Sequence, residues 1–199
     1  MTATRSPAPP QLPAAGGVYL TFDDGPDPGF TPRILDALAE VRLTATFFVV
    51  GQLACRQAAL LRRIAEQGHE VGNHTWSHRH PWTLSETAAR REVRDATAAI
   101  ADILGRSPVH FRPPHGRVRR VMVEEARAHG QSLVLWHLSA VDWGPFGRAR
   151  GIARRLRRAR PGDIVLMHDG GWGINHPAEL LQVLPAFLPR LATQAGPRV

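Results

Sequence analysis

Short apolar segments alternate with amphipathic segments along almost the whole chain, and this alternation constrains the fold more than any other feature. Three of the apolar segments, FFVV at 47–50, LVLW at 133–136 and IVLM at 164–167, have no polar residue in them. Strands that are apolar on both faces belong to a parallel sheet covered by helices. The fold class is therefore α/β. About six strands in 199 residues fall below the ~250 residues of a full eightfold barrel, so the pattern leaves open an incomplete barrel and an open doubly wound sheet.

Capping residues and turn residues predict where the individual elements lie. Ser85 as an N-cap and Gly105 as a stop predict a long helix over 84–104. Strands are expected at 18–22, 46–50, 70–74, 109–112, 132–138 and 164–167. Helices are expected at 31–41, 58–67, 84–104, 118–129, 152–160 and 178–191.

The composition excludes several classes of protein. With 43% hydrophobic residues the chain can fill a core, and with one cysteine, Cys55, it forms no internal disulfide. Cys55 is interpreted as an ordinary helix residue without a nucleophilic role. No segment is long and apolar enough to span a membrane, so no membrane span is expected.

The formal net charge of +8 draws the protein toward anionic surfaces, an acidic cell-wall polymer among them. The densest arginine run, 148–160, contains Ile152 and Leu156 at helical spacing, which favours a solvated helix face over a polyanion site. Since no nucleic-acid-binding motif accompanies the arginines, no nucleic-acid partner is expected.

Residues 1–17 contain no apolar run of the kind that a secretory leader needs. They are expected to form a flexible lead-in, followed by one compact domain over 18–199. Either the protein is cytoplasmic, or its natural start precedes Met1 and it is secreted or associated with the cell wall.

Chemically capable residues gather where the predicted strands end. They are Asp23, Asp24, His74, Arg112, Asp142 and His168. In both candidate architectures the carboxyl ends of the strands form the active-site face, so these six side chains are expected to converge.

Three of these residues, together with His78, suggest a metal site. Asp23 and Asp24 are adjacent, so their side chains point in different directions and can take separate roles. His74 and His78 stand four residues apart, which on a helical turn places both imidazoles on one side. Two histidines and one carboxylate, with open positions, are typical of catalytic Zn²⁺ sites and of non-haem iron sites.

Five motifs occur in a specific order: TFDDGP at 21–26, HTWSH at 74–78, FRPPHG at 111–116, VDW at 141–143 and LMH at 166–168. In order and spacing they resemble the polysaccharide deacetylases of the NodB-homology type, carbohydrate esterase family 4. The resemblance runs from about Val18 to the C-terminus. It implies a distorted, incomplete (β/α)7 barrel that hydrolyses N-acetyl groups, usually on N-acetylglucosamine units, or O-acetyl esters on xylan.

The resemblance also implies a role for each matching residue. Asp24, His74 and His78 would hold Zn²⁺, Co²⁺ or another divalent transition metal, which lowers the pKa of a water and polarises the acetyl carbonyl. Asp23 would be the general base and His168 the acid that protonates the departing amine.

The remaining roles support this chemistry. Arg112 would orient Asp23 and hold it ionised, and Asp142 would hold the His168 imidazolium. The main-chain N–H of His115 would stabilise the oxyanion, and Trp143 and Leu166 would enclose the acetyl methyl group.

Two positions depart from the family pattern. The family usually has Tyr where this chain has His115, and Asp where it has Ser139. Because the role at 115 belongs to the backbone and Asp142 is retained, catalysis is expected to survive with an altered sugar groove. Trp76, Trp82 and Trp172 either stack against sugar rings or pack in the core or at the rim. A small N-acetylated metabolite as the substrate, and an inactive sugar-binding protein, remain as alternatives.

Overall fold

The computed structural model describes residues 17–194, so the predicted lead-in, apart from Gly17, lies outside the described residues. Seven strands are present: β1 (Tyr19–Gly25), β2 (Thr46–Val49), β3 (Glu70–Asn73), β4 (His110–Phe111), β5 (Ser132–Leu133), β6 (Leu138–Ser139) and β7 (Ile164–His168). Eight α-helices accompany them in the described residues: α1 (Thr31–Glu40), α2 (Gly51–Arg56), α3 (Ala58–Glu66), α4 (Glu86–Leu104), α5 (Arg120–Ala128), α6 (Ala149–Leu156), α7 (Pro177–Leu181) and α8 (Leu184–Gln194). Three 3₁₀ turns complete the described chain: η1 (Pro81–Thr83), η2 (Pro114–Gly116) and η3 (Gly144–Phe146).

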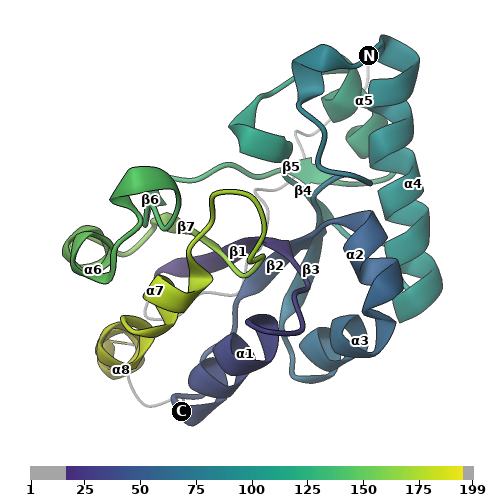
Figure 1. Cartoon of the computed structure of the whole chain (residues 1–199). Helices are drawn as coiled ribbons and strands as arrows, with labels where there is room; N and C mark the ends of the chain where they lie inside the picture. The colour runs from purple at the N-terminus through teal and green to yellow at the C-terminus, as the bar shows by residue number, and fades with distance from the viewer. Residues whose placement is uncertain (1–16, 195–199) are drawn as a thin grey trace, which may run out of the picture.

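All seven strands belong to one parallel sheet in the order β5-β4-β3-β2-β1-β7-β6. This is the cyclic strand order of a barrel that has been opened between β5 and β6. The sheet curls into a half-barrel with helices around it (Figure 1). The expected incomplete (β/α)7 barrel is confirmed, and the open doubly wound alternative is wrong.

The two faces of the sheet have different contents. On β1, Leu20 and Phe22 point outward into the main core, which is also filled by the helices, whereas Thr21 and Asp23 point to the concave inner face and contact Arg112. This alternation follows from the two-residue period of a strand. The outer face therefore supplies the stability of the fold, and the inner face is available for chemistry.

The expected strand over 132–138 is wrong. The segment forms two short strands, β5 and β6, that lie at opposite edges of the sheet. Between them, the carbonyl oxygens of Val134 and Leu135 accept hydrogen bonds from the Arg112 guanidinium, each at 3.2 Å. The apolar run therefore crosses the open side of the barrel and is held there by a buried cation.

The expected single helix over 178–191 is also wrong, because α7 ends at Leu181 and α8 begins at Leu184. Pro185 has no N–H to donate to the carbonyl four residues earlier, and its ring clashes with that carbonyl, so one continuous helix is broken here. By contrast, the long helix α4 is confirmed with its caps: the Ser85 hydroxyl accepts from the N–H of Ala88, and Gly105 takes a left-handed conformation at φ 70°.

The arginine run forms α6 and the turn after it, with Ile152 and Leu156 buried and Arg150, Arg154 and Arg157 exposed. The prediction of a helix with one buried stripe is confirmed. Among residues 17–194, no helix combines the length and the apolar character that crossing a membrane requires.

Candidate active site

Three side chains from two distant stretches of the chain meet at the carboxyl edge of the sheet. The Asp24 carboxylate oxygen Oδ1 lies 3.3 Å from Nε2 of His74 and 3.0 Å from Nε2 of His78. One donor atom from each of the three residues lies within 4.8 Å of the other two, and His74 and Asp24 are buried. The three residues that the sequence assigned to a metal are therefore close enough to share one ion.

The environment of these atoms fits a divalent cation. Oδ1 of Asp24 is buried and has no hydrogen-bond partner in the described structure. Nδ1 of His74 lies 2.7 Å from the carbonyl oxygen of Arg112; if Nδ1 carries the proton and donates it there, Nε2 presents a lone pair to Asp24. Two electron-rich atoms facing each other in a buried site need a positive charge between them.

The electrostatics of the group agree with this reading. Burial lowers the pKa of His74, but the charges of Asp23 and Asp24 outweigh it, so the pKa of His74 is raised. Burial raises the pKa of Asp24, but His74 and His78 outweigh it and hold that pKa well below its usual value. Both shifts show that the carboxylates favour a positive charge at this point of the site.

A β-bulge aims the Asp24 carboxylate. The register between β1 and β2 shifts between Asp23 and Gly25, and Asp24 has a left-handed backbone at φ 77°. Such bulges re-aim one side chain at the end of a strand. As a result both adjacent carboxylates reach the site: Oδ2 of Asp23 lies 3.7 Å from Nε2 of His74.

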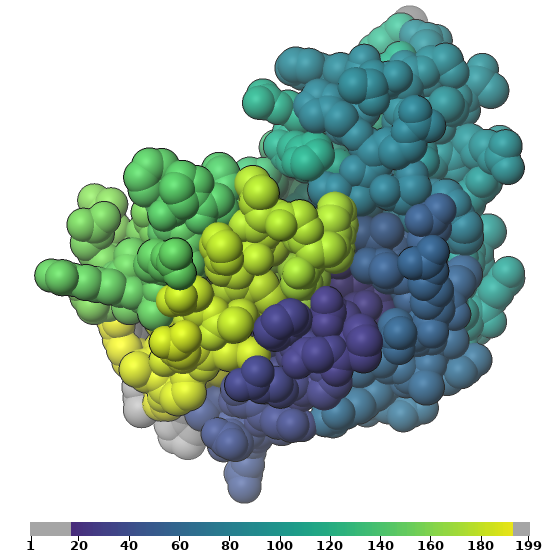
Figure 2. Space-filling view, in the orientation of Figure 1, coloured from purple at the N-terminus to yellow at the C-terminus, as the bar shows by residue number. Residues whose placement is uncertain are grey.

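The loop after β7 holds the other side of Asp24. The Asn175 side-chain amide donates to Oδ2 of Asp24 at 2.7 Å, and the Trp172 indole donates to the backbone carbonyl oxygen of Asp24 at 3.0 Å. The N–H of Gly171 donates to Asp27, and Figure 2 shows the loop, in yellow-green, lying against the purple residues after β1. The sequence analysis missed Asn175, since no motif marks an amide seven residues after His168.

The segment that carries both histidines is not a helical turn, so that prediction is wrong. Residues 74–80 form an irregular loop in which Thr75 and His78 have left-handed backbones, at φ 69° and 57°. The two imidazoles still meet, with ring centroids 5.0 Å apart. The loop conformation, rather than helical periodicity, brings them together.

Two polar side chains hold this loop against α4. Asn73 accepts from the N–H of Thr75 at 2.8 Å and donates to Thr97 at 2.9 Å. Glu92, which is buried, accepts from both the N–H and the hydroxyl of Ser77. The sequence analysis missed Asn73 and Glu92, because their contacts depend on how α4 packs.

Asp23 is paired with a fully buried arginine. Arg112 donates from Nη1 to Oδ1 of Asp23 at 2.7 Å and to the hydroxyl of Thr21 at 2.8 Å. Its guanidinium also lies over the ring of Phe48, 4.1 Å from the centroid. Burial lowers the pKa of Arg112 and the charge of Asp23 opposes that shift. Arg112 thus fixes the orientation of Asp23 with a planar group whose hydrogen bonds cannot rotate away.

His168 and Asp142 form a second charged pair. Nδ1 of His168 lies 2.8 Å from Oδ1 of Asp142, and the backbone N–H of His168 donates to Oδ2 of the same carboxylate at 2.8 Å. Burial lowers the pKa of His168, but the charge and hydrogen bond of Asp142 raise it to about 9. His168 is the register partner of Asp23 across β1 and β7, so the two side chains share one face of the sheet.

The remaining predicted residues surround this group. His115 lies in η2 with a left-handed backbone, and its ring lies 4.7 Å from that of His78. Leu166 is buried on the same face of β7 as His168, and Trp143 is bridged to Asn175 at the rim. At the position where the resemblance expects Asp, the Ser139 hydroxyl accepts from the N–H of Val141.

One buried carboxyl group at this edge was not predicted. Asp169 accepts a hydrogen bond from the Thr31 hydroxyl at 2.5 Å. Burial, together with Asp24 and Asp23, raises the pKa of Asp169 to about 7, although the Thr31 bond opposes the shift. A Cβ on Gly25 would lie 2.1 Å from Asp169, so the turn after Asp24 can approach this carboxyl only with glycine there.

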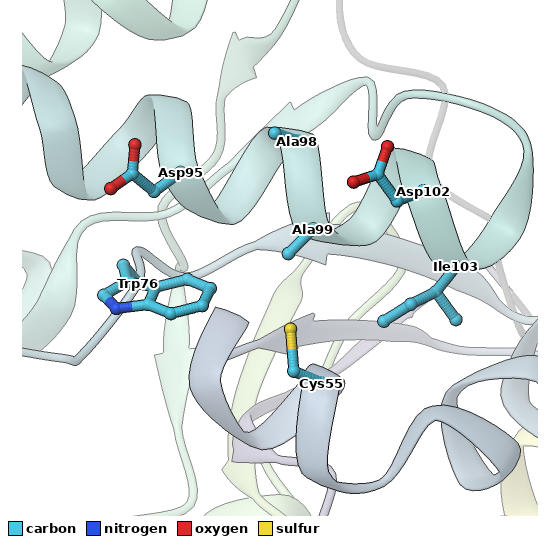
Figure 3. A pocket seen from close by; sticks show the side chains of 7 residues that line it. All are labelled: Cys55, Trp76, Asp95, Ala98, Ala99, Asp102 and Ile103. Atoms are coloured by element: carbon cyan, nitrogen blue, oxygen red, sulfur yellow. The ribbon is translucent and has the colours of Figure 1, made fainter.

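A depression of about 400 Å³, lined by none of Asp24, His74 and His78, lies between α2 and α4 (Figure 3). Cys55 of α2 and Trp76 line it together with the α4 residues Asp95, Ala98, Ala99, Asp102 and Ile103. Cys55 is exposed there. Trp76 contributes to this depression, so its indole is turned toward α4.

Comparison with known proteins agrees with the motif order. A family model described as polysaccharide deacetylase matches residues 13–134. The chain is 34% identical over 179 residues to a peptidoglycan-N-acetylglucosamine deacetylase of Bacillus cereus, covering 89% of this chain and 82% of the relative. It is 41% identical over 157 residues to a chitooligosaccharide deacetylase of Sinorhizobium fredii, covering 78% and 73%. A family 4 carbohydrate esterase from Streptomyces lividans, solved in complex with acetate, matches with a TM-score of 0.77 at 33% identity, covering 89% and 86%.

Proposed function

Since this chain belongs to the polysaccharide deacetylase family, we propose that it removes acetyl groups from N-acetylated sugar polymers of the peptidoglycan or chitooligosaccharide type. The single observation that carries the proposal is the meeting of Asp24, His74 and His78 beside Asp23. This arrangement joins a site for a divalent cation to a carboxylate that can accept a proton.

We assign Asp24, His74 and His78 to the cation. Their donor set of two imidazoles and one carboxylate suits Zn²⁺, with Co²⁺ or another divalent transition metal as a substitute. When bound, the cation supplies a Lewis acid that activates water and polarises the acetyl carbonyl. Asn175 keeps one oxygen of Asp24 occupied, so that the other oxygen faces the imidazoles.

The proton transfers fall to two other residues. Asp23, held in place by Arg112, accepts the proton of the attacking water. His168 uses Nδ1 to contact Asp142, which leaves Nε2 to donate a proton to the departing nitrogen. A protonated donor is essential because an amide anion is a very poor leaving group, and Asp142 keeps His168 protonated at neutral pH.

Two further groups complete the assignment. We assign the backbone N–H of His115, in η2, as a donor for the oxyanion of the tetrahedral intermediate. Leu166 and Trp143 supply apolar surface for the acetyl methyl group.

The test is acetate release from chitooligosaccharides, peptidoglycan fragments, acetylxylan and a monomeric N-acetyl sugar, with metal analysis of the same preparation. We expect release from the N-acetylated oligomers, and a loss of about 10²–10⁴ in kcat for Asp23→Asn with metal content unchanged. Failure of the metal-loaded protein on every substrate would overturn the proposal. Faster turnover of the monomer than of the oligomers would replace the polymer by a small metabolite.

A further inference from the structure

A row of aromatic rings leads outward from the proposed metal ligand His78. The ring of His115 lies 4.7 Å from that of His78, and the ring of His80 stacks on His115 at 5.3 Å. Trp82 follows, with its ring 5.8 Å from that of His80. Trp82 is 62% exposed. The row of rings that begins at His78 therefore ends in an indole that is open to solvent.

An arginine lies against this indole. The Arg117 guanidinium carbon is 5.3 Å from the centroid of the Trp82 ring, within the range of a cation–π contact, and Arg117 is exposed. Among the described residues no hydrogen bond or ion pair occupies the Arg117 guanidinium, so its N–H groups remain available. Trp82 and Arg117 therefore form one composite surface of apolar ring and positive charge, which we call the Trp82 platform.

The platform is held in place by the backbone around it. Arg119 donates from Nη1 to the carbonyl oxygens of Pro81 and Leu84, at 2.9 and 2.7 Å. These bonds clamp both ends of η1, the turn that carries Trp82. The indole is thus displayed by a fixed turn, although most of it packs against nothing.

The charge around the platform has one sign. Residues 79–84 and 113–119, which form this side of the rim, contain Arg79, Arg117 and Arg119 and no Asp or Glu. Arg119 is committed to the two carbonyl oxygens, whereas Arg79 and Arg117 are exposed. An anionic ligand would therefore meet arginines and no carboxylate within these two segments.

We propose that the Trp82 platform binds the sugar ring next to the reacting N-acetyl sugar, and that Arg117 selects a ring that bears a carboxylate. The inference rests on the proposed function and adds a substrate class, a glycan with a carboxylate on the neighbouring residue. The apolar face of a pyranose stacks on an indole. A guanidinium fork matches a carboxylate with two parallel hydrogen bonds.

The experiment compares two substrates of equal length: a neutral chitooligosaccharide, and a peptidoglycan glycan fragment whose alternate sugars carry a carboxylate-bearing ether. kcat and KM are measured at low and at moderate salt. We expect the wild-type protein to favour the carboxylate-bearing substrate, and added salt to reduce that preference by screening. Direct binding of both oligosaccharides is measured by calorimetry, so that the platform is tested even if acetate release is absent.

Three variants and a control separate the contributions. Arg117→Gln is expected to raise KM for the anionic substrate about three- to tenfold, with little change in kcat and a smaller effect on the neutral one. Arg117→Lys is expected to recover part of the preference, because the charge returns without the fork. Trp82→Ala is expected to weaken the binding of both substrates about tenfold. Arg62→Gln, an exposed arginine of α3, makes the same change of charge elsewhere.

The outcomes are distinct. Equal effects of Arg117→Gln and Arg62→Gln, or unchanged binding in Trp82→Ala, would overturn the inference while leaving the deacetylase proposal intact. No acetate from either substrate, with the anionic one still bound through Trp82 and Arg117, would overturn the proposed function alone. Thermal unfolding of each variant checks that the fold is retained.

Discussion

Glu92 of α4 accepts two hydrogen bonds from Ser77, one from its N–H at 2.8 Å and one from its hydroxyl at 2.5 Å. Ser77 directly precedes the proposed metal ligand His78, whose backbone is left-handed. A loop in such a conformation is retained only when its surroundings hold it there. Glu92 is therefore a positioning residue that keeps the imidazole of His78 beside Asp24.

This relationship predicts that Glu92→Ala weakens metal binding. The expected loss is about 10–100-fold in affinity, as for other groups that orient metal ligands. Glu92→Gln, which keeps an acceptor for the N–H, is expected to recover most of it. Competition with a chromophoric chelator measures the dissociation constant. Glu66→Ala, at an exposed position of α3, is the control. An equal metal affinity in all three variants would contradict the positioning role of Glu92.

Removal of a proposed metal ligand is expected to separate metal binding from folding. Asp24→Asn keeps the size of the side chain and the contact with Asn175 but removes the charge that faces two imidazoles. We expect loss of stoichiometric metal and of acetate release, with the circular dichroism spectrum retained. Thorough chelation of the wild-type protein is expected to give the same result, reversed by added Zn²⁺. An enzyme that stays fully active after chelation would contradict the metal assignment.

Loss of Arg112 is expected to be costly because it leaves Oδ1 of the buried Asp23 carboxylate without its arginine donor. Arg112→Met is expected to lower the free energy of unfolding by about 3–5 kcal/mol, measured by urea denaturation. Adding Asp23→Asn removes the carboxylate charge that faced Arg112. The double variant is therefore expected to be more stable than the sum of the two single losses implies. Arg94→Met, at an exposed position of α4, should change little. Strict additivity would mean that the pair is not coupled.

The pH dependence of activity is expected to report the contact between His168 and Asp142. The pKa of His168 is raised to about 9, so the protonated acid persists at neutral pH and kcat/KM should fall as pH rises through about 9. In Asp142→Asn the carboxylate charge that raises the pKa of His168 is gone, while burial still lowers that pKa. The decrease in kcat/KM is therefore expected to move to lower pH. A decrease that stays in place would show that another group causes it.

The raised pKa of His168 also stabilises the folded protein, and the pH range of that contribution can be stated. The folded protein holds the His168 proton more tightly than the unfolded chain, whose ordinary histidine pKa is 6.5. The contribution is thus complete below pH 6.5 and is lost as pH rises through about 9. The stability difference between the wild type and Asp142→Asn is expected to shrink over that range in urea denaturation.

Much of the fold was predictable because it depends on local patterns. The strands β2 and β7 follow from continuous apolar runs and the helix α4 from its caps, and both signals act over a few residues. The convergence of Asp23, His74 and His168 followed from one general rule, that parallel strands end at a common edge. Where the apolar pattern continued across 132–138, it gave no sign that Arg112 interrupts the strand by taking two carbonyl groups.

The sequence alone thus determined the fold class, the family and a set of candidate site residues in the motifs, since these are carried by periodicity and by motif order. Only the tertiary structure decided how those residues face one another. Asn175, Glu92 and Asp169 lie far along the chain from the groups they hold. Their contacts come from the packing of whole elements, and no spacing in the sequence encodes a distance across the sheet.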